Sequence, residues 1–339
     1  MHYELLLAVV LVGSLTFYTL LGGADYGGGI WDLLSTGSRA QQQRDLIANA
    51  ITPVWEVNHV WLILVIVLLF AGFPPAFAAI TTALHIPLVL LLLGIVFRGM
   101  SFTFRTYDTR SARVQRFWGY IFSVASLLTP MLLGVVVGAV TDDNLRIEDG
   151  NSVHGFVHTW LSPFPIIVGL FAVSLFAYLA ATFLTVEAHT EELREDFRTR
   201  ALFAGCTVAF LALVTFLDAR YAAREVEFAL LHRSWSVGAQ LVTAAASIAS
   251  FWCLVTRRYK LARIAVGTQI SCILWGWALA QFPFLVRPQL TIYNSASPDT
   301  VLRDILLACV AGTLVLFPSM RFLYKVFKAE AGAGEANLH

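Results

Sequence analysis

The chain has 339 residues, of which 58% are hydrophobic and only 13% are charged. Its mean hydropathy of +0.72 shows that it carries more apolar surface than a soluble domain can bury. It lacks the short segments of alternating polarity that build membrane barrels, so the composition predicts an all-α, polytopic membrane protein. A net charge of +1 gives no sign of a nucleic-acid partner.

Nine apolar stretches are long enough to cross a bilayer, which takes about 20 helical residues. They lie near residues 4–24, 53–73, 76–97, 117–140, 163–186, 201–219, 236–256, 262–282 and 301–323. The first has no Lys, Arg or A-x-A cleavage site, so we expect it to stay as a span rather than be removed as a signal peptide. We expect one membrane domain over residues 1–328 and a short cytoplasmic tail over residues 329–339.

The distribution of basic residues predicts the orientation. With nine spans, 17 of the 23 Lys and Arg residues fall on the side of the carboxyl-terminal tail and 6 on the other side. Because loops rich in Lys and Arg stay in the cytoplasm, the amino terminus is expected outside and the carboxyl terminus inside.

A glycine-rich stretch around Asp25 closes the first span, with five glycines between Gly22 and Gly29. Glycine allows close backbone approach, so Asp25 could sit in an unwound helix end near another helix or a ligand. A nucleotide-binding loop is excluded, because no strand precedes the stretch and no Lys-Ser/Thr follows it. A solvated carboxylate at a helix terminus remains the alternative.

The second span opens with ionisable residues. Pro53 suits a first helical turn and Thr52 an N-cap, which places Glu56 just below the cytoplasmic surface. Glu56 and His59 are three residues apart and share a helix face, so they could form a proton entry point. The alternative is that Glu56 caps free amides at the helix start while neighbouring tryptophans form an interfacial belt.

Two further ionisable residues lie in the third expected span. His85 is expected near its middle and Arg98 at its end. Either could act as a relay, and His85 could ligate a haem or simply donate a hydrogen bond to a neighbouring helix.

Metal-binding patterns are weak. The four cysteines lie in apolar spans without a C-x-x-C spacing, so we expect small buried hydrophobes and no covalently attached haem. His154 and His158 are four residues apart, but no third ligand has a matching spacing, so no metal site is expected. Gly134 and Gly138 predict close helix packing rather than chemistry.

Two of these motifs resemble subunit II of the cytochrome bd-type quinol oxidases. That family typically shows D-G-F-D-x-G after its first helix and P-x-W-D/E/G-x-N-x-V-W-L in its second. This chain has Gly22-Gly-Ala-Asp25-Tyr-Gly and Pro53-Val-Trp55-Glu56-Val-Asn58-His-Val-Trp61-Leu. Gly22 replaces an acid that is frequent in the family, and Glu replaces a frequent Asp at position 56, as in a divergent branch.

The resemblance implies a bacterial inner-membrane complex. A larger subunit I would hold the haems, oxidise quinol and reduce O₂ to water, while this chain supports it as nine helices in two four-helix bundles plus one peripheral helix. It implies proton uptake from the cytoplasm through Glu56, Asp25 and His59, and a structural quinone near Trp55 and Trp61. A small single-helix subunit and membrane lipid are further expected partners.

Two other classes stay open on the sequence. A secondary transporter also has many helices and buried charges, but its ionisable residues would occur in corresponding spans of two halves. Here the acids cluster in the first two spans. A purely structural subunit without a proton path is the other alternative.

Overall fold

The computed structural model describes residues 2–51, 55–107, 112–145, 147–148, 151–152 and 155–336. Within these ranges, the description leaves out the side chains of residues 55–57, 105–107, 112, 147–148, 151–152, 317, 320 and 323–336. Long helices dominate this part of the chain. They are α1 (Tyr3–Leu33), α2 (Ala40–Ile51), α3 (Trp55–Gly72), α4 (Pro74–Ala83), α5 (His85–Tyr107), α6 (Ala112–Thr141), α7 (His158–Leu161), α8 (Pro163–Glu187), α9 (Glu191–Ala222), α10 (Arg224–His232), α11 (Ser234–Val255), α12 (Tyr259–Gln281) and α13 (Asp299–Ala336). Two short antiparallel hairpins join β1 (Ile147–Glu148) to β2 (Asn151–Ser152) and β3 (Phe284–Val286) to β4 (Leu290–Thr291).

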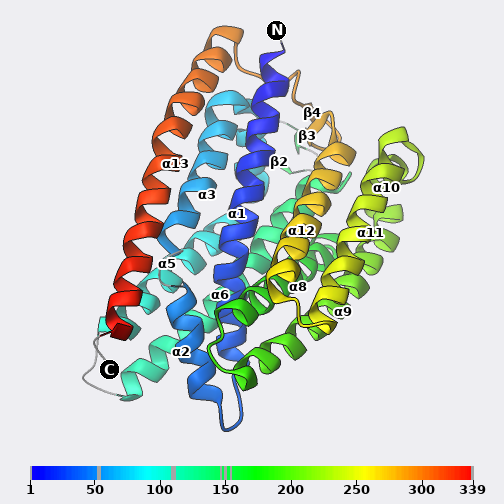
Figure 1. The fold of residues 1–339 in the computed structure, drawn as a ribbon. Coiled ribbons are helices and arrows are strands. Elements are labelled where there is room, and N and C mark those ends of the chain that lie inside the picture. The colour runs from blue at the N-terminus through cyan, green and yellow to red at the C-terminus, as the bar shows by residue number, and fades with distance from the viewer. Residues whose placement is uncertain are drawn as a thin grey trace.

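The long helices form two groups that share α8 as a neighbour. In the first group α1 packs against α3 and α6, and α5 packs against α6. In the second, α8 packs against α9 and α12, and α11 packs against α12. α13 runs beside α1 and α3 at one edge, with α10 and α11 at the opposite edge (Figure 1). The all-α, polytopic architecture expected from composition is confirmed.

Seven of the described helices are long and apolar enough to span a membrane: α1, α5, α6, α8, α9, α11 and α12. α3 and α4 together would make an eighth span, although they are bent by 117° at Phe73. Each of the nine expected ranges overlaps a helix, but the described residues do not establish nine spans. α13 continues to Ala336, through most of the range expected to form the tail.

The expected end of the first span at residue 24 is wrong, because α1 continues as a helix to Leu33. Its glycines are contact points rather than an unwound end. A Cβ on Gly27 would lie 2.0 Å from the Phe176 carbonyl oxygen of α8, and one on Gly29 would lie 2.1 Å from the Ser126 hydroxyl of α6. Glycine therefore lets both helices approach the α1 backbone closely, as small residues do between membrane helices.

The same close packing occurs between α6 and α8. A Cβ on Gly134 would lie 2.7 Å from the Gly169 backbone, and one on Gly138 would lie 2.6 Å from Pro165. The packing role expected for Gly134 and Gly138 is confirmed.

The third span begins later than expected. The chain breaks at Leu84, so α4 is separate and His85 is the first residue of α5 rather than a mid-span residue. Pro87 then lies in the first turn of α5. Backbone N–H groups there have no acceptor within the helix, so a proline, which lacks the N–H, is tolerated. Hydropathy alone merges the two helices because both sides of the break are apolar.

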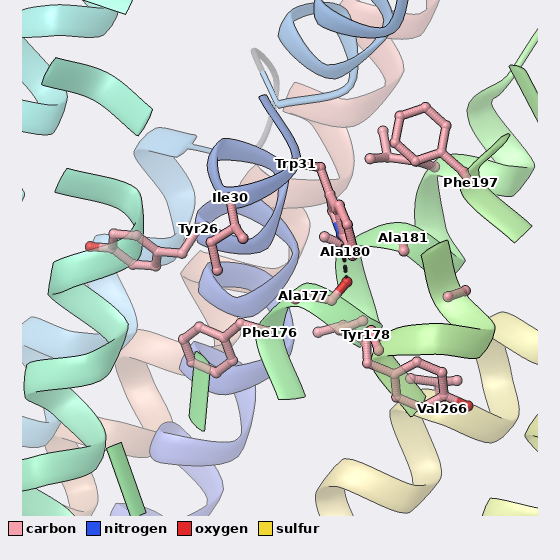
Figure 2. Packing of buried hydrophobic residues seen from close by; sticks show 14 of the residues in the cluster. Tyr26, Ile30, Trp31, Phe176, Ala177, Tyr178, Ala180, Ala181, Phe197 and Val266 are labelled. Carbon is pink, nitrogen blue, oxygen red and sulfur yellow. Dashed lines mark hydrogen bonds between the residues drawn. The ribbon is translucent and has the colours of Figure 1, made fainter. Parts of the chain in front are cut away.

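The core between α1 and α8 is built from aromatic and small side chains. Figure 2 shows Trp31 reaching from α1 to the Ala177 carbonyl of α8, to which its indole nitrogen donates at 2.7 Å. Tyr26 and Phe176 stack with ring centroids 6.4 Å apart. These contacts fix the register of α1 against α8 near the carboxyl end of α1.

Polar contacts hold α2 against α9 at the same end of the molecule. Arg39 pairs with Asp196, and Gln43 donates to the same carboxylate at 2.8 Å. Arg200 in turn donates to the Gln43 side-chain oxygen at 2.7 Å. The connection from α1 to α3 is thereby anchored to the second helix group.

Ser297 ties α13 to α3 at the other end. Its hydroxyl donates to the Ala71 carbonyl at 2.7 Å and its backbone N–H donates to the Gly72 carbonyl at 2.9 Å. These carbonyls are left without helical partners because α3 breaks before Pro74.

The packing of α1 on α8 gives a first prediction. Replacing Gly27→Ala is expected to lower the thermal stability of the assembled protein, by about 1–3 kcal/mol, because the added methyl overlaps the α8 backbone. Gly13→Ala is the matched control, since a Cβ there meets nothing within 4 Å. Thermal unfolding of the two purified variants measures the difference, and equal stability would contradict the close contact.

Candidate functional site

Asp25 and Arg98 form a buried ion pair in the first helix group. The Arg98 Nη1 donates to one Asp25 carboxylate oxygen at 2.9 Å, and Nη2 donates to the other and to the Asp25 backbone carbonyl at 3.3 Å. Asp25 is 1% exposed and Arg98 is 2% exposed. This two-pronged geometry is the strongest that an arginine and a carboxylate can form.

Two neutral side chains complete the polar centre. Asn58 donates from its amide nitrogen to an Asp25 carboxylate oxygen at 2.6 Å, and Arg98 Nε donates to the Ser126 hydroxyl at 3.0 Å. Both are fully buried. Asp25 comes from α1, Asn58 from α3, Arg98 from α5 and Ser126 from α6, so every long helix of the first group supplies one member.

Aromatic rings enclose the guanidinium group. Its central carbon lies 4.6 Å from the centre of the Tyr26 ring and 4.8 Å from that of Phe122. Such faces attract a cation and exclude bulk water. The charge of Arg98 is therefore balanced by one carboxylate and by two rings.

The arrangement can hold charge inside a membrane. An isolated ion there is costly, whereas the Asp25–Arg98 pair is neutral overall and its donors and acceptors are largely satisfied. Any group brought near it meets a strong local field in a low-dielectric surrounding. The site has the chemistry to orient water and to favour proton exchange at a neighbouring ionisable side chain.

His59 is the neighbouring ionisable side chain that the structure describes. It is half-buried on α3 and lies within electrostatic reach of both Asp25 and Arg98. The side chains of Glu56 and Trp55, and the whole of Thr52 and Pro53, lie outside the described residues. His59 is therefore near the buried pair, whereas the position of the Glu56 carboxyl group, with which it is expected to share a helix face, is not described.

Trp61 lies two residues after His59 on α3. It is buried, and its ring stacks on Phe17 of α1 with centroids 4.5 Å apart. A quinone role for Trp61 stays a prediction.

His85 lies far from this site. It is exposed at the start of α5, with Nδ1 2.9 Å from the Thr82 carbonyl oxygen and its ring edge-on to Phe156. Thirteen residues separate it from Arg98, which corresponds to about 20 Å of helix. The expected mid-membrane position is thus wrong, and a relay between His85 and the buried pair would have to cross that distance.

Sequence reasoning missed two partners of the expected residues and one further buried pair. Asn58 and Ser126 bind the ion pair directly, and Ser123 donates to the buried carboxylate of Asp32 at 2.7 Å. The available signal was a polar side chain within a long apolar stretch, which is costly unless it has a partner. The pairing itself depends on which helix faces pack together.

The residues described offer no group of three His, Cys, Asp or Glu side chains that could hold a metal ion. His154, half of the histidine pair considered above, lies outside the described residues.

Comparison with known proteins identifies the chain. The family described as cytochrome bd terminal oxidase subunit II matches residues 3–327. The chain belongs to this family. The fold agrees with the bd oxidase of Geobacillus thermodenitrificans, to which this chain is 23% identical with a TM-score of 0.82, covering 96% of this chain and 99% of that one.

Individual relatives of this subunit II differ in the quinol named. A Bacillus subtilis protein named as a cytochrome bd menaquinol oxidase subunit II is 23% identical over 96% of this chain and 95% of its own length. Subunit 2 of the Escherichia coli K12 cytochrome bd-I ubiquinol oxidase is 29% identical over 62% of this chain and 52% of its own length.

Membership of the family means that the chain is a multi-span subunit of a terminal oxidase complex with a subunit I, in which the haems are held mainly by that partner. The match over nearly the whole chain favours this assignment over a secondary transporter.

The ion pair gives a second prediction. Asp25→Asn is expected to destabilise the subunit II assembly by about 3–5 kcal/mol, because it leaves the Arg98 charge buried without compensation. Arg98→Met is expected to do the same from the other side.

The double variant Asp25→Asn with Arg98→Met distinguishes an ion pair from two independent residues. It is expected to lose less stability than the sum of the single variants, because neither charge is then left alone. Thermal unfolding of the four proteins completes the cycle, and additive losses would show that the two charges do not stabilise each other.

Proposed function

We propose that this subunit II conducts protons from the cytoplasmic side toward the O₂-reducing site of the haem-bearing partner. Protons enter at Glu56, pass His59 and reach the field of the Asp25–Arg98 pair. Quinol oxidised by the complex releases its protons on the outer side, so charge separates across the membrane without a pump. The observation that carries this proposal is a buried ion pair with two polar partners, the four side chains coming from four different helices.

The division of labour among these residues follows from their contacts. Arg98 and Asn58 hold the Asp25 carboxylate, so protonating it would leave the Arg98 charge without its counter-ion. Asp25 therefore acts mainly as a fixed charge that orders the site. Glu56 and His59 are the groups that exchange protons, because a carboxyl and an imidazole can both do so near neutral pH when their surroundings are tuned.

Orientation and partners belong to the same proposal. The excess of basic residues supports an amino terminus outside and a carboxyl terminus in the cytoplasm of a bacterial inner membrane. Trp55 and Trp61 are proposed to bind a quinone with a structural role. The relatives name both menaquinol and ubiquinol, so the proposal covers quinols as a class. A small single-helix subunit would complete the complex.

The competing function is structural support of subunit I without proton transfer. The same ion pair would serve that function if it only joins helices. Glu56→Gln separates the two functions in the complex purified with its subunit I. The proton path predicts that O₂ consumption falls by at least about tenfold, as expected when a proton-transfer group is lost, with unchanged haem spectra.

Glu192→Gln is the matched control, because Glu192 is exposed at the start of α9. It is expected to leave turnover unchanged. Oxygen-electrode rates and visible spectra measure both variants, and a Glu56→Gln complex with normal turnover would exclude proton entry at Glu56 and favour the structural function.

A further inference from the structure

One face of α1 is polar or glycine over most of its length. Its members follow one another at intervals of three or four residues, which places them on a single helix face. They are Ser14, Tyr18, Gly22, Asp25, Gly29 and Asp32. Of these, only Asp25 belongs to the proposed path. Every one of them is buried. A membrane helix with a buried polar face running past its charged centre is a candidate for ion handling.

Toward the carboxyl end, the face is joined to the ion pair through α6. Ser123 donates to Asp32, and Ser126, one turn away on the same helix, accepts from Arg98. Gly29 lies between the two carboxylates and leaves room for the Ser126 hydroxyl. This half of the face consists of groups with partners.

Two tyrosines near the ion pair differ from this pattern: Tyr18, on the polar face toward the amino end, and Tyr26, which directly follows Asp25. Tyr18 is 1% exposed and Tyr26 is 0% exposed, yet among the residues that the structure describes neither hydroxyl has a hydrogen-bond partner. The Tyr18 ring lies over Gly22 and so extends along α1 toward Tyr26. The two hydroxyl groups lie close together, at the margin of hydrogen-bond geometry, and both are within electrostatic reach of Asp25 and Arg98.

Packing explains the rings of these residues but not their hydroxyl groups. Arg98 needs an aromatic face at Tyr26, and a phenylalanine ring would supply it, as Phe122 does on the other side. A buried hydroxyl without a partner costs free energy, and folded proteins usually satisfy such groups with ordered internal water. The Asn58 side-chain oxygen, also buried and unpartnered in the described part of the chain, points to the same need.

From these contacts we infer that Tyr26 and Tyr18, with internal water completing their hydrogen bonds, extend the proton path from the Asp25–Arg98 site along α1. The inference rests on the proposed function. Each tyrosine hydroxyl accepts a proton from the preceding oxygen and gives its own to the next, so one O–H bond forms for each that breaks and no phenolate is needed.

Tyr18→Phe and Tyr26→Phe test the inference in the complex with subunit I, because each removes only the hydroxyl. Tyr178→Phe is the matched control: Tyr178 is also buried, but it lies in α8 and donates to the Ser250 hydroxyl at 2.8 Å. We expect Tyr18→Phe and Tyr26→Phe to lower O₂ consumption by about tenfold with unchanged haem spectra and no loss of thermal stability. Tyr178→Phe is expected to keep its turnover and lose thermal stability.

Two further readouts separate proton transfer from packing. If the hydroxyls carry protons, the two variants show a larger solvent deuterium isotope effect on turnover than the parent, and slower charging of proteoliposome membranes. A packing role would move neither quantity. Normal turnover in both variants overturns the inference, and so does a loss of turnover that comes with lowered thermal stability or altered haem spectra.

Glu56→Gln, measured alongside, distinguishes the two levels of the argument. Slow Glu56→Gln with normal tyrosine variants overturns the tyrosine path and leaves the proposed function standing. Normal turnover in all three variants overturns both. Slow turnover in the tyrosine variants alone supports the path along α1 and moves its entrance away from Glu56.

Discussion

The Asp25–Arg98 pair is the contact on which the first helix group depends. Lipid tails are as apolar as leucine, so hydrophobic burial alone does not bring membrane helices together. Here α1 and α5 are joined by opposite charges, while Asn58 of α3 and Ser126 of α6 bind the same two side chains. If one of these four helices were missing or shifted, a buried charged or polar group would lose its partner. This polar centre therefore specifies which four helices pack together and at what depth.

Glycine makes this polar centre compatible with close packing. Asp25 is followed by Gly27 and Gly29, whose missing side chains admit the α8 backbone and the Ser126 hydroxyl. The same stretch that brings α8 near α1 therefore also positions a hydrogen-bond partner for Arg98. Structure and chemistry at this site use the same residues, which is why stability and turnover must be measured together.

The sequence predicts the helical architecture well, because twenty-residue apolar stretches follow directly from bilayer thickness. It also indicates Asp25 and Arg98, since charges within such stretches are costly. It does not predict their pairing, which depends on helix rotation and depth. It misplaces the end of α1, because packing against neighbouring helices keeps the glycine-rich stretch helical. It also misplaces the start of α5, because the break at Leu84 leaves no trace in the hydropathy. The unpartnered hydroxyl groups of Tyr18 and Tyr26 become visible only when the neighbouring helices are in place.

The attachment of Ser297 to the broken end of α3 has a mechanical consequence. α3 bears Glu56 and His59 toward one end, and its other end is fixed to the segment that leads into α13. Sliding α3 along its axis would remove the hydrogen-bond donors of the Ala71 and Gly72 carbonyls. The turns of α3 that carry Glu56 and His59 are thus held at a constant depth relative to the segment before α13. If protons enter at Glu56 as proposed, they are admitted by side-chain rotation rather than by movement of the helix along its axis.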